Sequence, residues 1–120
     1  MAGTGGTDAG VPSSPAAAVI DLTGVTDPDR LLQLARDELS ASRVQSAVAV
    51  LDRYMALFPY GSDEAFYLYG LAWEQDTPFR NIRTSYAYYR KVRDEFPRSA
   101  RWKEAAGRVA YLEKHYYGLR

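Results

Sequence analysis

The sequence predicts an all-α domain of about five antiparallel helices, stacked as two helical hairpins and a C-terminal capping helix in an α–α superhelix. Three observations carry this prediction. Apolar residues recur every three or four positions over most of the chain after residue 30, which is the period of one helix face. Two similar stretches end in Phe-Pro, and their prolines, Pro59 and Pro97, are 38 residues apart. Every proline after residue 25 lies at an end of a predicted helix.

The N-terminal part differs from the rest in composition. Residues 1–18 are mostly Gly, Ser, Thr, Pro and Ala, so they have almost nothing to bury. We therefore divide the chain into a flexible tail or linker, residues 1–25, and a helical domain, residues 26–120. The tail ends in an apolar patch that is expected to lie as a strap against the first helix, with docking to a partner as the alternative. This patch comprises Val19, Ile20, Leu22 and Val25.

The first predicted hairpin begins at a helix-capping signal. Asp27 or Thr26 can accept hydrogen bonds from free backbone N–H groups, and Pro28 suits a first turn. After a turn at residues 40–43, a second helix is predicted over about residues 44–58. The two apolar faces consist of Leu31, Leu34, Ala35 and Leu39, and of Ala47, Val50, Leu51, Tyr54 and Leu57.

The second hairpin follows the break at residues 59–61. Ser62 is expected to cap its first helix, and a break at residues 76–78 separates this helix from the next, which Pro97 ends. Ser99 can cap the fifth helix. The apolar positions of these three helices are Phe66, Tyr69, Gly70 and Trp73, then Ile82, Tyr86, Tyr89, Val92 and Phe96, then Trp102, Ala105, Ala106, Val109 and Leu112.

Aromatic residues are frequent, and helical spacing suggests where they point. Tyr86 and Tyr89 share one face, so they are expected inside the hairpin, whereas Tyr88 is expected to face outward. Trp73 and Trp102 are expected to be structural.

Composition excludes several kinds of chemistry. The chain has no cysteine, which rules out disulfides and thiolate catalysis in this sequence. His115 is the single histidine, and neither metal-ligand spacing nor a nucleophile–base pair surrounds it. Glu74 and Asp76 sit at a predicted helix end and point different ways, which favours a solvated role over acid–base chemistry. We therefore expect no enzyme activity, cofactor or metal.

The charges are segregated although they sum to zero. Residues 29–77 carry eight acidic residues and four arginines, whereas residues 78–120 carry four acidic residues and eleven lysines or arginines. Such a basic half can be a solvated helix face, a surface for an acidic protein or anionic lipid, or a nucleic-acid surface. Nucleic acid is the least favoured, because no module signature is present. The residues of this basic surface are Arg83, Arg90, Arg93, Arg101 and Arg108.

The second hairpin resembles the tetratricopeptide (TPR) repeat. The matching residues are a large residue, then Gly70 at the close approach of two helices, then the aromatic Trp73, with a proline at the end of the unit. In the first unit Glu38 takes the place of that aromatic. The resemblance implies stacked hairpins whose leading helices line a concave face that binds protein segments.

A narrower resemblance covers residues 29–120. The strings V-L-D-R-Y-M-A-L-F-P, Y-L-Y-G-L-A-W-E-Q and Y-Y-R-K-V-R-D-E-F-P-R-S look like BamD-type outer-membrane assembly lipoproteins and their spirochaetal relatives. This resemblance implies a periplasmic lipoprotein anchored to the outer membrane that acts in envelope assembly, with its signal and lipidated cysteine missing from this sequence. The alternatives are a cytoplasmic TPR adaptor that binds a partner peptide and a protein that binds an anionic lipid or polymer through its basic surface.

The family's spacing implies which residues face the groove. An apolar floor with a few charges could take an extended or helical peptide from another protein, although these residues could instead pack on the strap or on a further repeat. Self-association through the acidic and basic halves is a further possibility. The implied groove residues are Leu32, Arg36 and Leu39, then Tyr67, Leu71 and Glu74, then Ala105, Val109 and Leu112.

Overall fold

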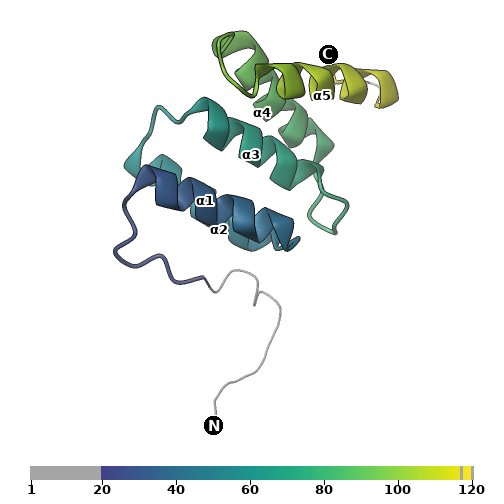
Figure 1. The fold of residues 1–120 in the computed structure, drawn as a ribbon. Helices are drawn as coiled ribbons and strands as arrows, with labels where there is room; N and C mark the ends of the chain where they lie inside the picture. The colour runs from purple at the N-terminus through teal and green to yellow at the C-terminus, as the bar shows by residue number, and fades with distance from the viewer. Residues whose placement is uncertain (1–19, 117, 120) are drawn as a thin grey trace.

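The computed structural model describes residues 20–116, 118 and 119, and within them it contains five helices and no strand (Figure 1). This confirms the predicted all-α fold and the number of helices. The predicted flexible tail, residues 1–18, and Val19 of the strap lie outside the described residues. The helices are α1 (Pro28–Ser40), α2 (Val44–Leu57), α3 (Asp63–Glu74), α4 (Ile82–Glu95) and α5 (Trp102–His115).

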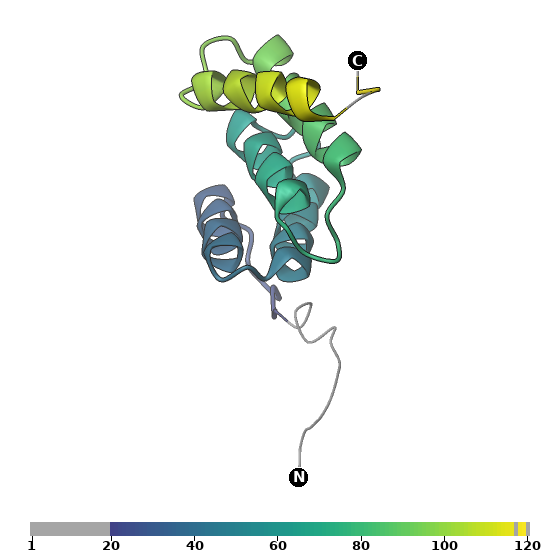
Figure 2. The ribbon, with the colours of Figure 1, turned by 90° about the vertical axis from the view of Figure 1, so that its right-hand side faces the viewer.

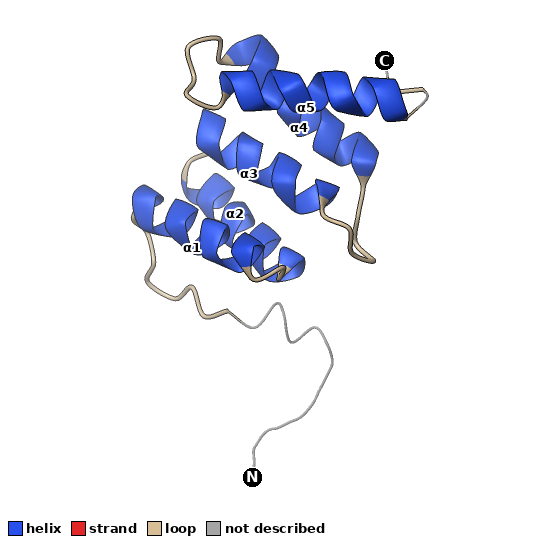
Figure 3. Cartoon of the chain, turned by 45° about the vertical axis from the view of Figure 1, so that its right-hand side comes forward, coloured by secondary structure: helices blue, strands red, loops and turns tan. Residues whose placement is uncertain are grey.

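The helices stack in three layers, which are the α1–α2 hairpin, the α3–α4 hairpin and α5. α1 packs on α2 and α3 packs on α4, so each pair forms a hairpin, and α5 packs on α4 (Figures 2 and 3). α3 also contacts both helices of the first hairpin. As a result α1, α3 and α5 lie on the same side of the stack, with α2 and α4 behind them (Figure 1). No helix in the described part of the chain is long and apolar enough to cross a membrane.

Side-chain caps fix most of the helix starts. Asp27 Oδ2 accepts a 2.8 Å hydrogen bond from the Arg30 N–H, and Ser62 Oγ accepts one of 3.1 Å from the Ala65 N–H, as the sequence predicts. The prediction for Ser99 is wrong. α5 begins only after Arg101, and Ser99 Oγ accepts from the Arg101 N–H within the preceding turn.

The turn between the hairpins depends on Gly61. Its φ of 70° lies in the left-handed region, which glycine adopts without strain. A Cβ at this position would also lie 2.3 Å from Cζ of Phe66, so the Phe66 ring packs directly on the backbone of the turn. The chain can therefore reverse tightly after α2 and bring α3 against the first hairpin.

An aromatic layer joins α3 to α4. The rings of Tyr69 and Tyr88 stack with centroids 4.5 Å apart, and Phe66 lies 6.1 Å from Tyr88 and 5.9 Å from Phe96. Tyr86 and Tyr89 are buried, as predicted. The expectation that Tyr88 faces outward is wrong, because a long side chain on the flank of α4 can lean back onto α3.

The segment before α1 packs on the core. Ile20, Leu22 and Val25 are half-buried against it, and Arg53 Nε of α2 donates a 3.2 Å hydrogen bond to the Val25 carbonyl oxygen. The strap, which the sequence predicts to lie against the first helix, is thus also tied by a hydrogen bond to α2.

The turn of the first hairpin contains a buried carboxylate. Glu38 accepts hydrogen bonds of 2.8 and 3.0 Å from Nε and Nη2 of Arg43. These bonds hold the pKa of Glu38 below its usual range, although burial acts in the opposite direction. The ion pair therefore occupies the position where the repeat pattern has an aromatic residue.

Candidate functional site on the face formed by α1, α3 and α5

Two shallow hollows lie along the side formed by α1, α3 and α5. They have volumes of about 220 and 430 Å³, and Leu71 lines both, so they adjoin at this residue, and we call the two hollows together the groove. We call this surface the concave face. The first hollow is lined by Arg36, Leu39, Ser40, Tyr67, Leu68, Leu71 and Arg101, and the second by Leu71, Glu74, Gln75, Asp76, Arg80 and Arg108.

Glu64, in the first turn of α3, joins three elements of the concave face. It accepts a 2.8 Å hydrogen bond from Arg36 Nη1 of α1, and bonds of 2.8 and 3.1 Å from Nε and Nη2 of Arg101. Burial raises the pKa of Glu64, but the bonds from Arg101 and Arg36 outweigh it and leave that pKa below its usual value. The carboxylate is therefore charged at neutral pH and fixes both guanidinium groups.

Glu74, in the last turn of α3, has the same role at the other end of the groove. It accepts hydrogen bonds from Arg108 of α5 and, at 2.7 Å, from the Tyr89 hydroxyl. Hydrogen bonding to Glu74 raises the pKa of Arg108. Burial, together with the bond to Glu74, raises the pKa of Tyr89. Two carboxylates on α3 thus hold two arginines that lie seven residues apart, Arg101 directly before α5 and Arg108 within it.

Aromatic rings support these arginines. The Arg101 guanidinium lies 4.8 Å from the Tyr67 ring centroid, and Arg108 lies 4.3 Å from that of Tyr111. Burial is the main cause that raises the pKa of Tyr67, so this ring stays neutral. Each guanidinium is held on one side by a carboxylate and on its face by a ring, which limits its freedom before any ligand arrives.

Five of the predicted groove residues line the two hollows, namely Arg36, Leu39, Tyr67, Leu71 and Glu74. Leu32 of α1 is buried in the core and lines neither hollow. The groove positions implied for the fifth helix are wrong: Ala105, Val109 and Leu112 are at most 1% exposed. The reason is that α5 packs this stripe into the core and turns Arg101 and Arg108 toward α3.

The predicted basic surface is divided among several partners. Arg101 and Arg108 belong to the concave face, whereas Arg90 and Arg93 both lie at Asp94, at 3.8 and 2.7 Å. Arg83 donates a 3.3 Å hydrogen bond to the Gly118 carbonyl oxygen. The five arginines therefore do not make up one patch of free cations.

Two residues of the concave face escape prediction from the sequence. The sequence indicates only that Glu64 is an acidic residue that suits a first helical turn, because its partners are 28 and 37 residues away. Gln75 Nε2 donates a 3.1 Å hydrogen bond to the Leu39 carbonyl oxygen and joins the ends of α3 and α1. The sequence signal for these ion pairs is the seven-residue spacing of Arg101 and Arg108, which places both arginines on one face, where they can meet a neighbouring helix that carries acidic residues.

Within the described residues, no group of three or more acidic or histidine side chains could hold a metal ion. The ring of His115 packs against that of Tyr111, with centroids 4.2 Å apart. The arrangement on the concave face orients charges and an apolar floor, which is suited to binding.

Comparison with known proteins gives one distant relative. An uncharacterized protein of Treponema pallidum (strain Nichols) is 31% identical over 114 residues, which cover 88% of this chain and 22% of the relative. The chain thus spans about a fifth of that protein's length. No protein-family model matches the chain, and no solved structure matches it. The fold and the groove define a stack of helical hairpins with an open face.

Proposed function

We propose that this chain is a non-catalytic module that binds a segment of another protein on its concave face. The observation that carries the proposal is the set of oriented side chains along one groove. Leu39, Tyr67 and Leu71 supply an apolar floor, and two guanidinium groups at its edge are held in place by Glu64. Grooves of this composition suit peptide segments that bring apolar anchors and a few polar groups.

The charges of the first hollow indicate the chemistry of the segment. Two arginines line this hollow; Glu64 pairs with both of them, and Glu104 lies 3.6 Å from Arg101. Arg36 and Arg101 keep about a third of their side-chain surface exposed while they are paired. A segment with an apolar side chain next to an aspartate, a glutamate or a terminal carboxylate would complement the hollow.

The cellular setting is part of the proposal. We place the module in the periplasm on an outer-membrane lipoprotein that acts in envelope assembly, and the support is the resemblance of residues 29–120 to BamD-type proteins. The alternative is a cytoplasmic adaptor with the same groove. Fractionation of source cells tests the placement: recovery of the full-length protein in the cytosol alone would overturn it and leave the groove proposal intact.

Site-specific photo-crosslinking tests the groove. A photoreactive amino acid replaces Leu71 in the full-length protein within source cells, and a matched variant carries it at Ala87, an exposed position on α4. We expect a discrete adduct from position 71 and not from position 87. Equal adducts from both positions, or none from position 71, would contradict the proposal.

A peptide from the crosslinked partner then allows a direct measurement. Leu71→Glu should weaken its binding at least tenfold, because a carboxylate would stand on the apolar floor and repel an acidic ligand. Leu71 is the better probe, since Tyr67 is only 9% exposed and its truncation would disturb the fold. Unchanged affinity in the Leu71→Glu variant would place the binding site elsewhere.

A further inference from the structure

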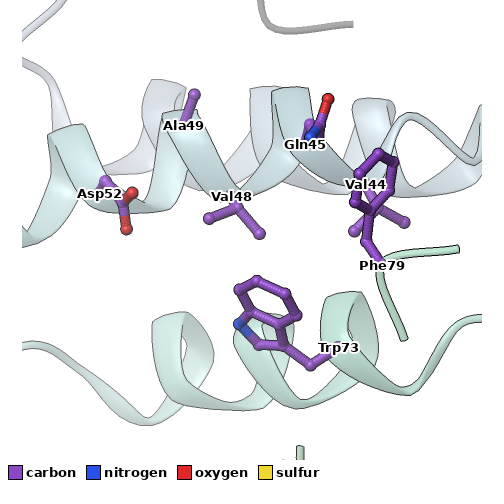
Figure 4. Close-up of a pocket in the computed structure, with 7 residues that line it drawn as sticks. All are labelled: Val44, Gln45, Val48, Ala49, Asp52, Trp73 and Phe79. Atoms are coloured by element: carbon purple, nitrogen blue, oxygen red, sulfur yellow. The ribbon is translucent and has the colours of Figure 1, made fainter. Parts of the chain in front are cut away.

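A separate cleft of about 370 Å³ lies between α2 and the end of α3 (Figure 4). It shares no lining residue with the concave face. Its volume is at the lower end of the range for ligand pockets, so it holds one or two large side chains. We call it the α2 cleft, and its lining residues are Val44, Gln45, Val48, Ala49, Asp52, Trp73 and Phe79.

The walls of the α2 cleft are apolar. Figure 4 shows the Val48 side chain directed toward the Trp73 indole, with Phe79 beside Val44. Phe79 is 45% exposed, although burial of an aromatic ring of this size stabilises a protein. The loop that carries Phe79 is held by backbone hydrogen bonds from Arg80 N to Thr77 O at 3.0 Å and from Asn81 N to Trp73 O at 2.8 Å. The ring is therefore presented by a fixed turn.

One end of the α2 cleft carries a carboxylate, that of Asp52. Asp52 Oδ1 accepts a 2.7 Å hydrogen bond from the Tyr69 hydroxyl, and within the described residues no lysine, arginine or histidine pairs with Asp52. The nearby arginines are engaged elsewhere. Arg43 pairs with Glu38, Arg53 donates to the Val25 carbonyl, and Arg80 pairs with Asp76.

We propose that the α2 cleft docks a segment of a second protein that carries a large apolar side chain and, close to it, a lysine or arginine. The apolar side chain would enter between Val48, Trp73 and Phe79, and the cation would meet Asp52 at the rim. Charge complementarity argues for this occupant, because among the described residues the ionic group that lines the cleft is a carboxylate with no ion pair. The first hollow of the concave face, lined by Arg36 and Arg101, has the opposite preference, so the two sites would accept different partners.

Two synthetic peptides of about twelve residues test this proposal. Both are capped, alanine-rich and helical, and both carry one leucine; the first has a lysine four residues from the leucine, and the second has glutamate in its place. The full chain is titrated with each peptide and followed by NMR. The indole N–H signal of Trp73 reports on the cleft, and that of Trp102, which donates to the Arg93 carbonyl oxygen, is the internal reference.

We expect the lysine peptide to shift the Trp73 signal saturably, with an affinity about three- to fivefold higher than that of the glutamate peptide, the size of one partly exposed ion pair. Asp52→Asn should abolish this difference, because it removes the charge but keeps an oxygen that accepts from Tyr69. Phe79→Ala should weaken both peptides equally, since the ring lines the apolar part of the cleft. Circular dichroism melting checks that both variants fold.

Several results would overturn the proposal. The first is a Trp73 signal that does not shift at peptide concentrations up to millimolar, and the second is equal affinity for the two peptides. The third such result is a set of shifts confined to Trp102 or to the concave face. A shift of Trp73 that grows with protein concentration in the absence of peptide would identify a second copy of this chain as the occupant. Trp102 is 39% exposed and precedes Lys103, so the chain itself carries the required chemistry.

Discussion

The Ser85 hydroxyl donates a 2.7 Å hydrogen bond to the backbone carbonyl oxygen of Gly70, in the buried contact between α4 and α3. A serine and a glycine face each other here, so the two helix backbones approach closely. The Tyr89 ring fills the space over Gly70 and reaches Glu74 with its hydroxyl. The approach of the helices therefore positions one of the two carboxylates that fix the arginines of the concave face.

We predict that Gly70→Ala destabilises the domain by about 1–3 kcal/mol, the usual penalty of overpacking a filled core. A Cβ at position 70 would lie 2.6 to 2.9 Å from three atoms of the Tyr89 ring, so the ring or the helix must shift. Gly70→Leu should prevent folding altogether. Chemical or thermal unfolding followed by circular dichroism measures the change.

Gly107→Ala is the matched control. Gly107 lies inside α5, and a Cβ there would meet no atom within 4 Å. Alanine is favoured over glycine in a helix interior by roughly 0.5–1 kcal/mol, so this variant should be more stable than the parent. If the two substitutions changed stability equally, the close contact at Gly70 would not be the cause.

The hairpins could be predicted because their signals are local. Asp27 and Ser62 cap the helices that follow them, and Gly70 stands at the small position of a repeat pattern. The rotation of α5 could not be predicted in this way. Val109 and Leu112 belong to an apolar stripe that suits either the groove or the core, and only the packing of α5 on α4 decides between them.

The candidate site was partly predictable, because some of its residues are also indicated by local sequence patterns. Leu71 and Tyr67 follow from the spacing of the repeat family that the second hairpin resembles. The ion pairs of Glu64 depend on residues from three elements that are distant in sequence, and a charge pattern does not say which acid meets which base. The α2 cleft depends on where a loop presents Phe79, which periodicity does not describe.

Glu64→Gln should lower the free energy of unfolding by about 1.5–3 kcal/mol, the typical range for hydrogen bonds to charged groups. The substitution keeps the shape of the side chain but leaves Arg36 and Arg101 without their shared carboxylate. Urea unfolding at pH 7 provides the measurement. The same variant should also loosen the concave face, which hydrogen exchange of the α1 and α5 amides can detect.

Asp76→Asn provides the comparison for an exposed pair. Asp76 lies 3.5 Å from Arg80, and its side chain is 95% exposed, so water and salt screen the interaction. Its removal should change stability by no more than about 0.5 kcal/mol. A larger effect at Asp76 than at Glu64 would mean that the three-residue pairing on the concave face is not a source of stability.

Tyr89→Phe should destabilise the domain by about 1–3 kcal/mol, because it deletes the donor of a partly buried hydrogen bond to Glu74. Tyr69→Phe removes a similar bond to Asp52, at 2.7 Å, but Asp52 is exposed and water can replace the lost donor. We therefore expect the smaller change at Tyr69. Equal losses in urea unfolding would show that burial of the acceptor does not determine the effect.

The free energy of unfolding should decrease in acid, because the carboxylates that pair with arginines become protonated. Hydrogen bonds from arginines hold the folded-state pKa values of Glu38 and Glu64 below the unfolded value of 4.5. A carboxyl group with a depressed folded pKa binds protons more readily in the unfolded state, so its stabilising contribution is complete above about pH 5.5 and is lost as the pH falls through 4.5 and below.

The double variant Glu38→Gln, Glu64→Gln should be less stable at pH 7 and should lose less stability between pH 6 and pH 3. Asp21 and Asp94, whose pKa values are also lowered, should keep the profile from becoming flat. Parallel profiles for the parent and the double variant, measured by urea unfolding across this range, would show that other groups govern the response to acid.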